Sequence, residues 1–250
     1  MMSASPLYRS PNALLQELGI TTPREIHLEG IAEHCGATIV YRRTVGCEAR
    51  VVGYGTRAII TVNEASRLER RRFSAAHELG HWMWDRGTIA LNCSEDQFEG
   101  EWSDETIERR ANRYAADLLL PDFMVQPIVQ DCDITFAMVN HLVEQFSTSI
   151  TATAIRLVEL GSFPAILICS KAGKRRWFFR SALVPPDYWP YTEPRPGTAT
   201  FDALNKPFEK GVVRNLTGES WIGHPNARQQ RIHEEAIRLT PHLVLSLVTW

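Results

Sequence analysis

Several features that would place this chain in a special class of protein are missing. Its 250 residues include only five cysteines, an odd number, and no two of them form a C-x-x-C pair. This spacing does not suit a disulfide framework or a cysteine-based metal site, so we expect reduced, mostly buried thiols. No segment approaches the ~20 apolar residues that cross a bilayer, and no basic stretch followed by an apolar run opens the chain. We therefore expect a cytoplasmic protein with no membrane partner.

An excess of charge of either sign is also missing. The chain has 27 basic and 29 acidic residues, a formal net charge of −2 and 44% hydrophobic residues. This balance does not indicate a polyanion-binding protein, and it argues against a disordered or fibrous one. The length is enough to bury a substantial core, in one large domain or two modest ones.

The first part of the chain combines helix and strand signals. Thr22-Pro23 suits the N-cap and first turn of a helix that continues until Gly36. Short runs rich in β-branched residues and punctuated by glycine then predict a small sheet, with strands at Ala37–Tyr41, Arg50–Tyr54 and Arg57–Val62.

Helical periodicity dominates the middle, and strand signals return beyond Gly161. The predicted helices are Ser66–Trp84, Asp104–Leu120, Ile134–Phe146 and Thr151–Leu160. The later strands are Ala165–Cys169, Arg176–Phe179, Val212–Leu216 and Leu243–Val248. We therefore expect an α+β fold with a domain boundary near Gly161-Ser162.

The clearest chemical signal is the motif H-E-x-x-H at His77-Glu78-Leu-Gly-His81, inside a predicted helix. Residues four apart lie on the same face of a helix one turn apart, so both imidazoles can reach one ion. Glu78 lies about 100° further round the helix, which suits a general base outside the ligand set. The alternative is chance, or two satisfied core histidines, but a random chain of this composition would show the pattern only about 2% of the time.

Catalytic zinc usually has three protein ligands, so a third is needed. Glu108 lies on the apolar stripe of the helix Asp104–Leu120, where an uncompensated carboxylate would be costly to bury. We predict Glu108 as the third ligand and zinc as the ion, with manganese or iron as alternatives. Asn112, one turn on, is a candidate for orienting a ligand, or an ordinary packing amide. Tyr114 and His141 are candidate donors to an oxyanion, or packing residues.

Two longer stretches around these residues resemble the ImmA/IrrE family of metallopeptidases. They are Arg70-Arg-Arg-Phe-Ser-Ala-Ala-His-Glu-Leu-Gly-His81 and Glu108-Arg-Arg-Ala-Asn-Arg-Tyr-Ala-Ala-Asp-Leu-Leu-Leu-Pro121, after the strand Ala58-Ile-Ile-Thr-Val-Asn63. The resemblance implies that His77, His81 and Glu108 bind metal and that Glu78 acts in catalysis. It also implies a protein substrate, a repressor of the XRE type that is cut under stress or during mobile-element induction.

The resemblance also implies how the chain is divided. Residues 1–130 would form a zincin-like metallopeptidase domain, 131–161 a helix-turn-helix-like segment, and 162–250 a strand-rich α/β domain similar to a GAF sensor. The second function class is a DNA-binding or sensory transcriptional regulator that retains the protease scaffold. The helix Thr151–Leu160 carries only Arg156 as a basic residue, so we expect no direct nucleic-acid binding.

Overall fold

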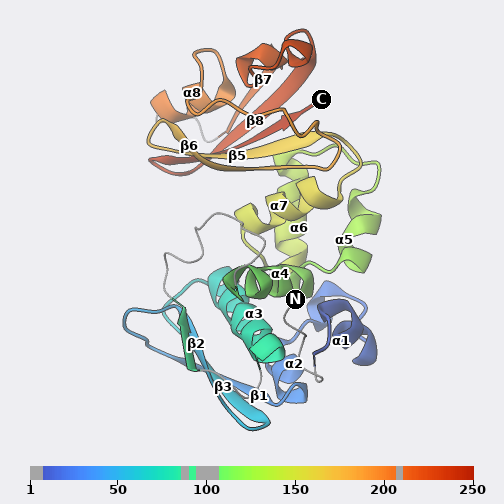
Figure 1. Ribbon diagram of the computed structural model, residues 1–250, viewed down its shortest axis with the longest axis vertical. Helices are drawn as coiled ribbons and strands as arrows, with labels where there is room; N and C mark the ends of the chain where they lie inside the picture. Colours follow the sequence, from blue (N-terminus) through green and yellow to red (C-terminus); the bar gives the residue numbers. More distant parts are fainter. Residues whose placement is uncertain (1–7, 86–89, 94–106, 207–210) are drawn as a thin grey trace. The chain divides into compact units, whose positions relative to one another are not determined.

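The computed structural model describes residues 8–85, 90–93, 107–206 and 211–250 (Figure 1). It confirms a mixed α+β fold with two sheets. The chain forms two compact units, each described by itself below: residues up to 125 with 143–149, and residues 126–142 with 150–250. None of the described helices is long and apolar enough to cross a membrane.

The first unit contains a four-stranded sheet of order β1-β3-β2-β4, in which only β1 and β3 are parallel. Its strands are β1 (Ala37–Arg42), β2 (Ala49–Tyr54), β3 (Arg57–Asn63) and β4 (Ala90–Cys93), and its helices are α1 (Pro11–Glu17), α2 (Leu28–His34), α3 (Leu68–Asp85) and α4 (Ile107–Leu119). The first three strands match the prediction, and β4 was not predicted. The predicted start of α4 at Asp104 lies outside the described residues.

One prediction about this unit is wrong. The helix expected from Thr22 to Gly36 is a 3-10 turn, Pro23–Glu25, followed by the separate helix α2. The Glu25 carboxylate accepts hydrogen bonds from the backbone N–H groups of Thr21 and Thr22, both at 2.9 Å, and closes the turn on itself. Ile26 then leaves the helical region, with ψ at 78°, and buries its side chain. The capping residues therefore end the first turn instead of extending it.

Helix α3 packs on one face of this sheet. The strands alternate in burial, and the face toward α3 carries small and branched residues such as Ala49, Val51 and Ile60. Gly53 is required here because a Cβ atom at that position would lie 2.5 Å from the Trp82 ring. The Trp82 indole N–H donates to the Cys35 carbonyl at 2.9 Å. Trp82 is thus a core residue, which fixes the side of α3 that faces the sheet.

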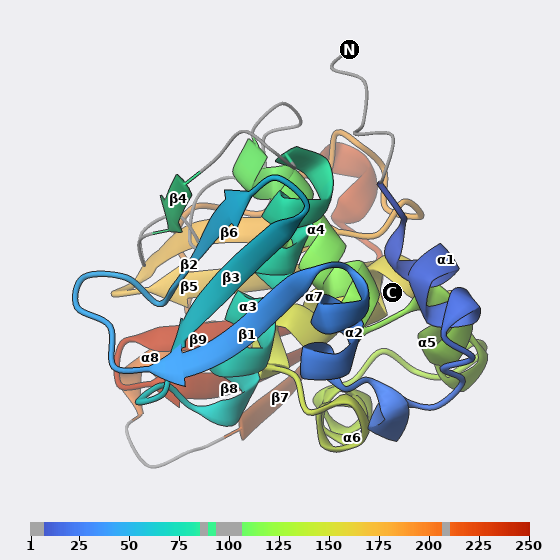
Figure 2. The same ribbon diagram turned by 90° about the horizontal axis from the view of Figure 1, so that it is seen from below.

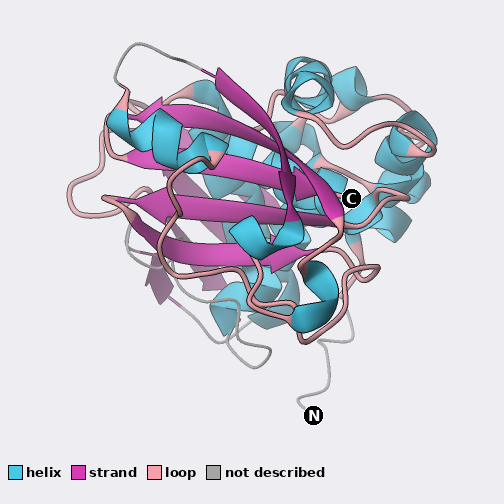
Figure 3. Ribbon diagram, turned by 90° about the horizontal axis from the view of Figure 1, so that it is seen from above, coloured by secondary structure: helices cyan, strands magenta, loops and turns pink. Residues whose placement is uncertain are grey.

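The second unit is built on an antiparallel sheet of order β6-β5-β9-β8-β7 (Figure 3). Its strands are β5 (Ala165–Lys171), β6 (Lys174–Arg180), β7 (Gly211–Thr217), β8 (Arg231–Thr240) and β9 (Leu243–Thr249). One face packs with α8 (Ala199–Asn205) and the core around Trp221, and α7 (Ile150–Leu160) contacts β5 and β6. The prediction lacks β8, because its charged and polar residues hide the alternation that its burial shows.

Helices α5 (Asp122–Val129) and α6 (Phe136–Phe146) connect the two units along the chain. The turn between α6 and α7 contains Ser147 with a positive φ of 53°. Arg156, the only basic residue of α7, is 2% exposed and lies 2.6 Å from Glu159. The arginine that a DNA-reading helix would use is therefore buried.

Candidate metal centre

Helix α3 carries both histidines and Glu78 on buried positions. His77 and Glu78 are fully buried and His81 is 1% exposed. Because α3 is a regular helix over this stretch, His77 and His81 lie one turn apart, and their rings are 4.6 Å apart between centroids. Two imidazoles taken out of water at one place are a strong indication of a shared polar partner.

Helix α4 supplies Glu108 from the first turn of its described part. The close approach of the two helices depends on Gly80, which lies between the histidines. A Cβ atom at Gly80 would lie 3.0 Å from the Tyr114 Cβ and 3.1 Å from the Ala111 Cα. A larger residue at position 80 would push α4 away from α3. Sequence reasoning missed this role, although a glycine inside a helix costs about 1 kcal/mol and so needs a reason.

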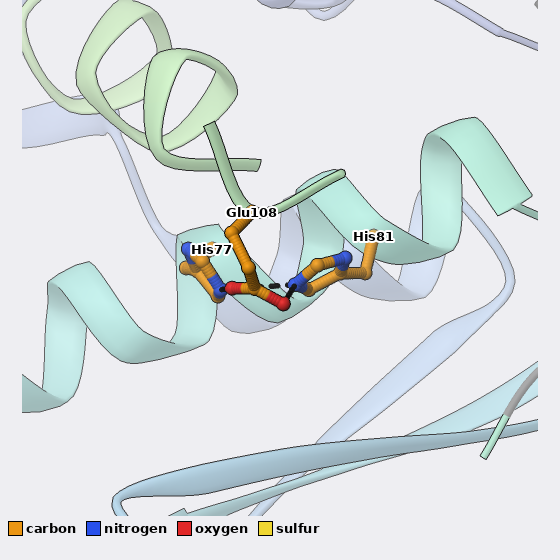
Figure 4. Close-up of side chains that lie close together, drawn as sticks. All are labelled: His77, His81 and Glu108. Atoms are coloured by element: carbon orange, nitrogen blue, oxygen red, sulfur yellow. Dashed lines mark hydrogen bonds and ion pairs between the residues drawn. The ribbon is translucent and has the colours of Figure 1, made fainter. Parts of the chain in front are cut away.

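The three side chains point toward one another (Figure 4). The Nε2 atoms of His77 and His81 are 2.9 Å apart, and the Glu108 carboxylate oxygens lie 3.2 Å from His77 Nε2 and 3.4 Å from His81 Nε2. Two atoms that each lie 2.0–2.1 Å from a tetrahedral zinc ion stand about 3.3–3.4 Å apart. The spacing and the donor types therefore fit a divalent ion, and this is the one group of three potential ligands within the described residues.

The electrostatics of the group favour the forms that bind metal. Burial lowers the pKa of His77, although its hydrogen bond with Glu108 opposes the shift. Burial alone would raise the pKa of Glu108, but hydrogen bonds from His77 and His81 outweigh it and hold that pKa well below its usual range. A neutral imidazole and an ionised carboxylate are the states that coordinate a cation.

Asn112 lies one turn after Glu108, and its Oδ1 is 2.9 Å from His77 Nδ1. When the imidazole donates its Nδ1 proton to this amide oxygen, the lone pair of the neutral ring is on Nε2, the atom that faces Glu108. The amide therefore selects the tautomer that can act as a ligand.

The other predicted site residues lie on α4 and α6. Tyr114 is 2% exposed and packs against Gly80. His141 lies on α6, in the second unit. Aromatic side chains close in sequence to the two histidines could line a substrate cleft. Of these, Trp84 stacks against Tyr8 with ring centroids 4.2 Å apart and lies under the Arg110 guanidinium. Trp102 lies outside the described residues.

Two histidines and a glutamate that converge from two packed helices are a group of the kind that binds the metal in zinc peptidases. The chain matches the family model described as the IrrE N-terminal-like domain over residues 32–158, half of its length, and it belongs to this ImmA/IrrE family of metallopeptidases. The family assignment inferred from the sequence is thereby confirmed.

Two curated relatives carry the name radiation response metalloprotease IrrE. The protein of Deinococcus radiodurans is 29% identical over 116 residues, which are 46% of this chain and 35% of that protein. The protein of Deinococcus deserti is 29% identical over 108 residues, 43% of this chain and 38% of the relative. The match thus spans little more than a third of either relative.

A solved structure with a similar fold is a Mycobacterium tuberculosis transcriptional regulator. The likeness covers 96% of this chain and 74% of that one, with a TM-score of 0.65 and 15% sequence identity. At this identity the likeness shows the fold alone.

Proposed function

We propose that this protein is a metal-dependent endopeptidase whose ion is held by His77, His81 and Glu108, with Glu78 as general base. The observation that carries the proposal is the convergence of the two Nε2 atoms and the carboxylate at distances of 2.9 to 3.4 Å. Zinc suits this donor set best, and manganese is the alternative. When bound, the ion supplies a Lewis acid that polarises the scissile carbonyl and acidifies the attacking water.

Each side chain has a defined task in this proposal. The Glu78 carboxylate takes a proton from the attacking water and passes it to the leaving amine. Its full burial keeps competing bulk water away from that proton transfer. Asn112 holds His77 in the binding tautomer, and Tyr114 or His141 is the candidate donor to the developing oxyanion.

For the substrate we propose a repressor of the XRE type, cleaved at one site in the cytoplasm during a stress or mobile-element response. The radiation-response names of the two relatives support a stress context. In this scheme residues 1–130 are the catalytic domain, 131–161 a helix-turn-helix-like segment, and 162–250 a GAF-like domain that senses the signal.

A second candidate function is a sensory or DNA-binding regulator that keeps the protease scaffold. The similarity in fold to a transcriptional regulator favours it. Burial of Arg156 argues against DNA reading by α7, so this regulator would act through its C-terminal strands.

The test is cleavage of candidate XRE-type repressors by the metal-loaded protein, compared with Glu78→Gln. We expect the variant to bind metal within about tenfold of the wild type and to lose about 10²–10⁴-fold in cleavage rate, because a general base contributes that much. Full peptidase activity in Glu78→Gln with metal bound would reject the mechanism. A regulatory effect in cells that is unchanged by the substitution would favour the second candidate.

A further inference from the structure

The face of the first sheet that points away from α3 has an unusual composition. Figure 2 looks onto this face, and no described helix of the first unit covers it. Val52 and Ile59 are direct partners on neighbouring strands, and their side chains are 51% and 54% exposed. Tyr54, at the end of β2, is 92% exposed. These neighbouring apolar side chains form a continuous strip.

The charged residues that these strands themselves place on this face are all basic, and the Glu33 carboxylate of α2 meets its edge at Thr38, at 3.0 Å. Arg42, Arg50 and Arg57 point outward on β1, β2 and β3, and no outward position of these three strands carries a carboxylate. Within the part of the chain that the structure describes, Arg42 and Arg50 have no ion-pair partner, and Arg57 lies 3.4 Å from the exposed Glu33. Other arginines of the unit are paired, as Arg70 is with Glu48 at 3.8 Å and Arg43 is with Glu64 at 3.7 Å.

We infer that this outward face is a docking surface for a protein segment that combines carboxylates with aliphatic side chains. The aliphatic residues would cover Val52 and Ile59, and the carboxylates would meet the three arginines. The complementarity of charge sets the partner's chemistry, since complementary potentials favour both encounter and specificity. No residue of this face belongs to the metal group, so the inference stands whether or not the proposed hydrolysis is correct.

Other occupants fit the face less well. A second copy related by a two-fold axis would place this basic face against the same basic face of its partner, and the like charges repel. A single-stranded nucleic acid would need a series of aromatic stacking platforms and more phosphate contacts, whereas Tyr54 is the one aromatic residue that points outward on β1, β2 and β3. The exposed aliphatic pair instead suits side chains of a protein.

The experiment uses fluorescein-labelled peptides of twelve residues with alternating Leu-Glu, Ser-Glu or Leu-Lys, and a twelve-nucleotide oligothymidine, titrated into the full chain. We expect saturable binding of the Leu-Glu peptide that weakens with salt. Arg50→Glu should reduce its affinity at least about tenfold through like-charge repulsion. Ile59→Ser should reduce it about fivefold because apolar contact is lost. Arg231→Glu, an exposed arginine of the second unit, is the matched control and should change affinity less than about twofold.

Circular dichroism and metal affinity of each variant establish that the fold is kept. Equal affinity for Leu-Glu and Ser-Glu peptides would overturn the inference, because only non-specific charge would then be acting. Binding of Leu-Glu that ignores Arg50→Glu would also overturn it. Tighter binding of oligothymidine, reduced by the same substitutions, would assign the face to nucleic acid instead.

Discussion

Both units of this protein bury ionisable side chains, but they satisfy them in different ways. In the second unit the fully buried Glu234 accepts hydrogen bonds from the backbone N–H groups of Ala199 and Thr200, at 2.8 and 2.9 Å, and from the Thr200 hydroxyl at 2.7 Å. The chain itself thus provides donors at the start of α8. In the first unit, three side chains bring one potential ligand atom each to the same place. They are His77, His81 and Glu108, and these atoms all lie within 4.8 Å of one another.

This difference separates a structural carboxylate from a candidate ligand. Burial of a charged group is common to both places, so burial alone does not mark a functional site. The convergence of several lone-pair donors does, because one cation can satisfy them together. The following predictions test whether the two places respond differently to equivalent substitutions.

The largest expected effect on folding is at Glu234. Glu234→Ala leaves the buried backbone N–H groups of Ala199 and Thr200 without an acceptor, whereas the Thr200 hydroxyl keeps its contact with Ser246. The second unit should lose about 3–5 kcal/mol of unfolding free energy, the usual result of removing one partner of a buried charged interaction. Urea unfolding, with hydrogen exchange in α8 and β8, measures the loss. Zinc affinity should not change. A substantial loss of zinc affinity would contradict the view that Glu234 is purely structural and that metal binds only at the His77, His81 and Glu108 group.

Asn112→Ala tests whether Asn112 orients His77 for metal binding. Loss of the hydrogen bond to His77 Nδ1 should lower zinc affinity about 10–100-fold, the usual effect of losing a residue that orients a metal ligand. Calorimetric titration measures it, with Asn140→Ala on the exposed face of α6 as the matched control. If both variants bind zinc equally well, Asn112 is only a packing amide.

A smaller effect is expected at Tyr41, a half-buried polar group of the first unit whose hydroxyl donates to Glu29. Burial, and then the hydrogen bond to Glu29 at 2.6 Å, raise the pKa of Tyr41 to about 12 from its ordinary value of 10.0. The folded state favours the neutral phenol, so the resulting stability is complete below pH 10.0 and is lost as the pH rises toward about 12.

Absorbance at alkaline pH should therefore show late titration of a tyrosine near pH 12 that disappears in Tyr41→Phe. The substitution should cost about 0.5–1.5 kcal/mol, the net value of one hydrogen bond, and leave zinc binding intact. A normal titration for every tyrosine would contradict the contact with Glu29.

The sequence predicted the elements whose pattern is local. Helix α3 and strands β1 to β3 follow from periodicity, and the spacing of His77 and His81 follows from helix geometry alone. The break at Ile26 was missed because the Glu25 capping contacts compete with continuation of the helix. Strand β8 was missed because Glu234 is buried by bonds to a helix 34 and 35 residues away in the chain.

The approach of Glu108 to the histidines could be predicted only in part. Its helix could be predicted from the apolar stripe, but the distances of 3.2 and 3.4 Å depend on how closely α4 packs on α3. That packing is set by Gly80 against Ala111, a long-range contact that no spacing rule contains.

Zinc titration of chelator-stripped protein by calorimetry probes the metal centre itself, comparing wild type with Glu108→Ala and with Glu235→Ala as a control in the second unit. We predict one tight site in the wild type and in the control. In Glu108→Ala the zinc affinity should fall more than about 100-fold, because loss of a ligand should weaken binding more than loss of a residue that orients one. A wild-type protein that binds no zinc or manganese, or a Glu108→Ala variant with unchanged affinity, would contradict the metal centre proposed for this protein.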